Sequence, residues 1–141
     1  YAVGPAALMA KMELMFQTIY SCVPPFIQYA GVSAIDGNWE LLRKRMEFYQ
    51  HLRDVMVGAL NEIPGVSCAA PKGSIYAFPN IQGTGLSSQE FAKTVLEKAG
   101  VAVVPGPCFG PRGEGYVRFC YLREESMLRE ACEKMKQVLA K

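Results

Sequence analysis

Residues 100–121 of this 141-residue chain read GVAVVPGPCFGPRGEGYVRFCY. The first part, 101–104, is mostly β-branched and predicts a strand. The middle part, 105–115, is rich in glycine and proline and predicts a loop. The last part, 116–121, alternates apolar residues with Arg118 and others, which predicts a second strand. Two strands joined by a shaped loop indicate a small sheet, and the rest of the chain is interpreted around it.

The segment before this sheet carries two more strand patterns. Val66 to Ala70 and Ser74 to Phe78 are short apolar runs, and Pro71-Lys72-Gly73 between them has turn composition. This order predicts a hairpin. Together with the two strands above, it gives a sheet of about four strands.

Helical periodicity dominates the remaining sequence. Apolar residues recur every three or four positions, and Ser87 with Glu90 has capping-box spacing before a segment that ends at Gly100. The other predicted helices are 5–18, 25–35, 38–62 and 124–140. The helix at 38–62 would be about 37 Å long, the size of an interdomain helix. The whole pattern predicts an α+β fold, a two-layer sandwich with a small, mainly antiparallel sheet and helices packed on one face.

Composition excludes several classes of function. Fifteen basic and thirteen acidic residues leave a net charge of +2, too small to indicate a nucleic-acid partner. The longest apolar run falls short of about 18 residues, so we expect no membrane segment. The single histidine, His51, is expected on the surface of the long helix, and a site that needs two histidines is excluded.

The cysteines indicate the compartment. Five are present, at 22, 68, 108, 120 and 132, without a C-x-x-C pair. An odd, scattered set predicts free thiols rather than a disulfide framework or a zinc site. We therefore expect a cytoplasmic protein with no metal site.

Arg118 is the residue most able to carry chemistry, and the sequence leaves two interpretations open. It can lie on the solvated face of the sheet, because Val117 and Phe119 beside it have the opposite parity. It can instead be a guanidinium held on a rigid strand to receive a carboxylate through two hydrogen bonds. The preceding loop strengthens the second interpretation, since Gly106 and Gly110 permit unusual backbone shapes around Phe109.

Three motifs in one order suggest a family. Pro71-x-Gly73-x-x-Tyr76-x-Phe78, the run from Gly100 to Gly110 and the run from Gly115 to Phe119 resemble the C-terminal part of class I/II aminotransferases. These are pyridoxal-phosphate enzymes of fold type I, in the aspartate aminotransferase superfamily. Ser21-x-x-Pro24-x-x-x-Gln28 resembles a segment that approaches the neighbouring subunit in their dimers. The resemblance covers nearly the whole chain.

The resemblance implies roles for the matching residues. Arg118 would bind the α-carboxylate of the amino-acid substrate. The loop residues Pro105, Gly106, Phe109 and Gly110 would line the substrate entrance. The partners implied are an amino acid, a 2-oxo acid and a second copy of the chain in a homodimer.

The resemblance also implies where the cofactor, pyridoxal 5'-phosphate, would lie. Tyr1, Thr18 and Ser21 would be near its phosphate or near the dimer contact. The lysine that links to the cofactor would fall just upstream of Tyr1, because none of the eight lysines lies in its motif. We therefore expect no catalytic residue within the chain and a fragment that binds no cofactor and is inactive.

The same resemblance divides the chain at residue 36. Residues 1–36 would be a helical segment that continues from the large domain, and 37–141 would be the small C-terminal domain. Two alternatives stay open. One is a fragment of another fold type I enzyme, a C–S lyase or an aminocyclopropane-carboxylate-synthase-like enzyme; the other is a non-catalytic binding module that kept the fold.

Overall fold

The structure is a computed structural model that describes residues 2–37 and 39–140. The chain divides into two compact units, Tyr1–Leu42 and Arg43–Lys141. The first unit contains α1 (Ala6–Ile19) and α2 (Pro25–Asp36), close to the predicted bounds. Pro25 opens α2 because the first helical position needs no amide donor. No residue of either helix is buried.

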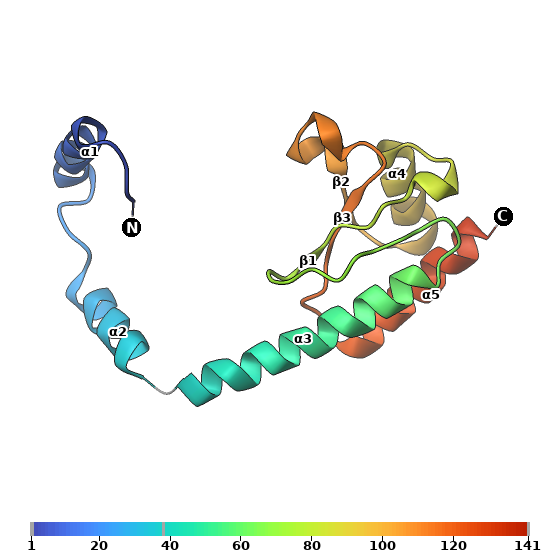
Figure 1. Ribbon diagram of the computed structural model, residues 1–141, viewed down its shortest axis with the longest axis horizontal. Helices are drawn as coiled ribbons and strands as arrows, with labels where there is room; N and C mark the ends of the chain where they lie inside the picture. Colours follow the sequence, from blue (N-terminus) through green and yellow to red (C-terminus); the bar gives the residue numbers. More distant parts are fainter. Residues whose placement is uncertain (1, 38, 141) are drawn as a thin grey trace. The chain divides into compact units, whose positions relative to one another are not determined.

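The second unit holds the core. Its helices are α3 (Trp39–Asn61), most of which lies in this unit, α4 (Ser88–Ala99) and α5 (Glu125–Leu139). Figure 1 shows α3 running beside α5, and Met56 and Cys132 join them with their sulfur atoms 3.7 Å apart. The sequence pattern placed these helices to within one or two residues at each end.

The sheet has three strands in the described part of the chain. They are β1 (Tyr76–Ala77), β2 (Val104–Pro105) and β3 (Val117–Cys120), in the order β1-β3-β2 with both pairings antiparallel. The buried Val117 and Phe119 face the same core as the buried residues of α3, α4 and α5. The α+β fold with helices on one face of a small antiparallel sheet is therefore confirmed.

The predicted hairpin is wrong in its pairing. β1 pairs with β3, and the earlier segment makes only an isolated bridge from Ser67 to Asn80. The side chain of Asn61, at the end of α3, takes the place of a strand partner. Its amide accepts from the Cys68 N–H at 2.8 Å and donates to the Cys68 carbonyl at 3.0 Å. These backbone groups are satisfied without a ladder.

The predicted strand at 101–104 is shorter than its composition suggested. α4 is capped by Gly100, which lies in the left-handed region, and the Val101 N–H donates to the Val95 carbonyl at 3.1 Å. This C-terminal cap takes the first residue of the run out of the strand. β2 begins at Val104. At the other end of α4, the Ser87–Glu90 capping box is present as expected.

Candidate functional site

Arg118 lies on β3, the central strand, and faces away from the core. Its neighbours Val117 and Phe119 are buried at 0% and 3% exposure, and alternate residues of a strand point to opposite faces. Arg118 itself is half-buried. Arg118 thus lies outside the core, as both interpretations require, but it is not fully solvated. The structure at this level is compatible with a solvated-face residue and with a guanidinium held for a ligand.

Two aromatic rings account for this partial burial. The Arg118 Cζ lies 4.2 Å from the centre of the Tyr76 ring and 4.4 Å from that of Phe109. Tyr76 comes from β1, on one side of β3, and Phe109 follows β2, on the other. The cation is therefore flanked by rings from both neighbouring strands, at distances typical of cation–π contacts.

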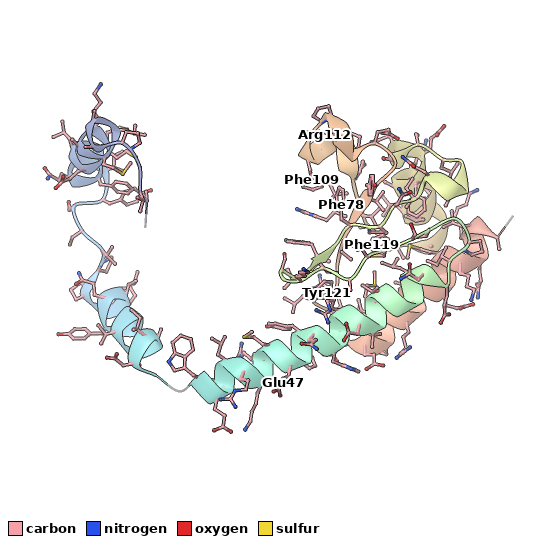
Figure 2. The ribbon with its side chains drawn as sticks, viewed as in Figure 1. Glu47, Phe78, Phe109, Arg112, Phe119 and Tyr121 are labelled. Atoms are coloured by element: carbon pink, nitrogen blue, oxygen red, sulfur yellow. The ribbon has the colours of Figure 1, made fainter. Side chains whose placement is uncertain are left out.

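The aromatic contacts extend beyond Arg118. Phe78 and Phe109, labelled in Figure 2, meet edge-on with their ring centres 6.0 Å apart. Phe78 also stacks on Tyr116, with the ring centres 5.5 Å apart. Phe78 and Phe109 keep 40% and 50% of their surface exposed, so this side of the sheet presents open ring surface next to the guanidinium. An arginine beside exposed rings can receive a ligand that combines an anion with an apolar part.

The donor edge of the Arg118 guanidinium has no hydrogen-bond acceptor in the part of the chain that the structure describes. Over residues 2–37 and 39–140, no carboxylate or carbonyl accepts a hydrogen bond from Arg118. Five N–H donors in a planar fork match the two oxygens of a carboxylate. The arrangement is suited to binding a small carboxylate in the plane of the guanidinium.

The loop between β2 and β3 is more regular than its composition indicated. It folds into two 3-10 turns, Gly106–Phe109 and Pro111–Gly113. The Gly106 N–H bonds the Tyr116 carbonyl at 2.8 Å, and a Cβ on Gly106 would collide with the backbone of Gly113. The two backbone segments pack so closely that neither glycine can carry a side chain.

A buried serine ties this loop to α4. The Ser88 hydroxyl accepts from the Gly115 N–H at 2.9 Å, and the Glu114 carboxylate accepts from the Ser88 N–H at 2.9 Å. Ser88 is fully buried. The start of β3 is thereby fixed to the start of α4. Sequence reasoning missed this contact, because Ser88 follows the capping Ser87 and has no distinguishing pattern.

The residues brought together at the site are Arg118 and Phe109, with Pro105, Gly106 and Gly110 in the adjoining strand and turn. From the sequence, Tyr76 and Phe78 were recognised only as part of a family motif, and their contacts with the site were missed. The alternation along the strand could have indicated their face of the sheet, since both residues flank the buried Ala77. The contact between Tyr76 and Arg118 could be predicted only from the pairing of β1 with β3.

The residues expected near the cofactor lie in the first unit or outside the described residues, as Tyr1 does. The Thr18 hydroxyl donates to the Leu14 carbonyl of its own helix at 3.2 Å. Ser21 has a φ of 62° and lines an apolar hollow of about 560 Å³ with Phe16 and Ile27. Their roles remain predictions.

The other candidates behave as ordinary structural residues. His51 is exposed, and its Nε2 lies 2.7 Å from the Glu125 carboxylate. This hydrogen bond, followed by that from Arg129, lowers the pKa of Glu125. In the described part of the chain all five cysteines are free thiols, and no three His, Cys, Asp or Glu side chains cluster as metal ligands. Each described helix is too short or too polar to span a bilayer.

Comparison with known proteins gives the family. A family model described as aminotransferase class I and II matches residues 1–135. The chain belongs to this family.

Individual relatives agree. The chain is 36% identical over 141 residues to the aspartate aminotransferase of Pyrococcus horikoshii, covering 99% of this chain and 36% of that protein. It matches the crystal structure of an aromatic aminotransferase from Pyrococcus horikoshii with a TM-score of 0.89 and 37% identity, over 98% of this chain and 37% of the other. A Clostridium difficile protein solved with pyridoxal phosphate bound matches with a TM-score of 0.68 and 28% identity, over 76% and 28%. The chain thus spans about a third of the length of these relatives.

Proposed function

We propose that this chain is the substrate-carboxylate-binding part of a pyridoxal-phosphate-dependent aminotransferase, which moves an amino group between an amino acid and a 2-oxo acid. The observation that carries the proposal is the guanidinium of Arg118, flanked by two rings and without an acceptor among the described residues. The family match supports the reaction class. The relatives' names differ in substrate, so the amino acid is left as a class.

Arg118 has two tasks in this reaction. Its two parallel N–H groups bind both oxygens of the α-carboxylate, which gives affinity for any α-amino acid. A carboxylate fixed at two points also restricts rotation of the rest of the substrate, and this orients the Cα–H bond for proton removal. The central strand suits both tasks, because β3 is hydrogen-bonded on both sides.

The cofactor is tested against the donors that the chain offers. The donor at this site is a single cation, the Arg118 guanidinium, between two aromatic side chains. This donor set fits a carboxylate and does not resemble the backbone N–H groups that bind a phosphate. The Thr18 hydroxyl proton is already given to Leu14, so Thr18 fits a phosphate poorly, whereas the Ser21 hydroxyl remains a candidate. Pyridoxal phosphate, when bound, supplies an electron sink for breaking the Cα–H bond. We assign to this chain the substrate side of the site.

The assembly and compartment are part of the same proposal. We propose a cytoplasmic homodimer in which residues 1–36 belong with a larger domain and 37–141 form the small domain. The exposed apolar surface of α2, including Phe26, Tyr29 and Ile35 at 73%, 77% and 72%, supports burial against other protein surface in the whole enzyme.

The test is Arg118→Ala in the full-length enzyme. A lost charge-assisted pair costs about 1.5–3 kcal/mol, so we expect KM for the amino acid to rise roughly tenfold to 150-fold. The absorbance of the bound cofactor should not change. Arg123→Ala is the matched control, because the Arg123 side chain is exposed and, among the described residues, donates only to the neighbouring Leu122 carbonyl. An unchanged KM, or loss of the cofactor band in place of a raised KM, would contradict the assignment.

A further inference from the structure

We propose that Tyr76 and Phe109 are positioning residues that hold the Arg118 guanidinium in one plane, with its donor edge open to the substrate carboxylate. This inference rests on the proposed function and deepens it. Neither ring has to touch the substrate, since each acts through the arginine.

The geometry of the flanking rings carries the first step. Their centres lie 4.2 and 4.4 Å from the Arg118 Cζ, and they come from β1 and from the turn after β2, on the two sides of β3. The Cζ atom thus lies over both rings, and rings at these distances limit the positions that the guanidinium can take. The five N–H donors of a guanidinium lie in its plane, so a carboxylate binds through the edge of the group.

Independent supports for the two rings carry the second step. Tyr76 is held by the pairing of β1 with β3, opposite Cys120. Phe109 is held by a different set of contacts. It ends a 3-10 turn closed by the Gly110 N–H to Pro107 carbonyl bond at 3.1 Å, and its ring meets Phe78. Two rings fixed by separate elements restrict the arginine more than one ring on a free loop.

Freedom of the arginine side chain carries the third step. Without the rings, Arg118 keeps its charge and gains rotamers, and the cost of ordering them falls on substrate binding. The loss is then specific to ligands that carry the carboxylate. A cation–π contact of this kind corresponds to roughly threefold to thirtyfold in affinity.

The experiment compares two probes on the full-length enzyme. One probe is whichever proteinogenic amino acid gives the highest kcat/KM in a panel, and the other is its decarboxylated amine, which lacks only the carboxylate. Single-turnover rates with each probe are measured by the change in cofactor absorbance. The variants are Phe109→Leu and Phe109→Tyr, Tyr76→Leu and Tyr76→Phe, and Arg118→Ala.

We expect Phe109→Leu and Tyr76→Leu to lower kcat/KM for the amino acid roughly threefold to thirtyfold. The rate with the amine should stay the same, and the aromatic replacements should restore the amino-acid rate. Phe48→Leu is the control for loss of an exposed ring, because Phe48 is 52% exposed on α3 and contacts the Tyr49 ring instead of Arg118.

The outcomes separate the two proposals. If Arg118→Ala abolishes the preference for the amino acid over the amine while both leucine variants keep it, the positioning role is wrong and the proposed function stands. If Arg118→Ala leaves the preference intact, the proposed function fails. If the leucine variants slow both probes equally, or the aromatic replacements fail to restore the rate, the rings serve the structure only.

Discussion

At the scale of single residues, the position of an arginine in an otherwise apolar strand is decided by where its charged group can be accommodated. Alternation along β3 predicted that Arg118 would leave the core, and it does, next to the buried Val117 and Phe119. Alternation could not predict Tyr76 as a neighbour, because that contact depends on which strand pairs with β3. A side chain's face is a local property, whereas its partners come from the fold.

The thiols give a prediction at this scale. Burial, followed by the nearby charge of Glu62, raises the pKa of Cys132 to about 11 from an ordinary 9.0. At pH 8 the thiolate fraction falls roughly hundredfold, and the thiolate is the reactive form. We expect iodoacetamide to label Cys132 at least a hundredfold more slowly than the exposed Cys108, measured by peptide mass spectrometry without denaturant. Equal labelling rates at the two positions would contradict the buried placement of Cys132.

At the scale of elements, the helices were predictable because their signals are local. The capping box, the glycine stop and the apolar period all lie within the element they define. The strands were less predictable, because β1 and β2 are only two residues long and are strands only through their pairing with β3. Asn61, which satisfies Cys68 from the end of a helix, has no signature in a strand pattern.

Helix α5 offers a matched pair of substitutions. Met135 is 0% exposed and Met127 is 54% exposed on the same helix. Met135→Ala should lower the free energy of unfolding by about 2–5 kcal/mol, since it leaves a cavity in the core. Met127→Ala should change it by less than about 0.5 kcal/mol. Urea unfolding followed by circular dichroism measures both, and similar losses at the two positions would refute the core assignment.

At the scale of the whole molecule, we expect the proposed reaction to need more than this chain provides. In the proposed function Arg118 binds the substrate carboxylate, whereas none of the eight lysines lies in the motif expected for the cofactor lysine. We therefore expect the 141-residue polypeptide, mixed with pyridoxal phosphate, to show no stoichiometric absorbance band and no transamination. The full-length enzyme is the positive control in the same assay. A saturable band with turnover in the short polypeptide would overturn this expectation.

The close approach of Gly106 and Gly113 limits which substitutions the chain can accept at these two positions. Gly100 is required by its left-handed backbone, with open space where a side chain would lie, so an asparagine there keeps the conformation. Gly106 and Gly113 are required by space alone, and enlarging either one presses on the other's backbone. A second substitution cannot compensate, because no residue is smaller than glycine. The turns before β3 can therefore not vary at these two positions, whatever the neighbouring residues are.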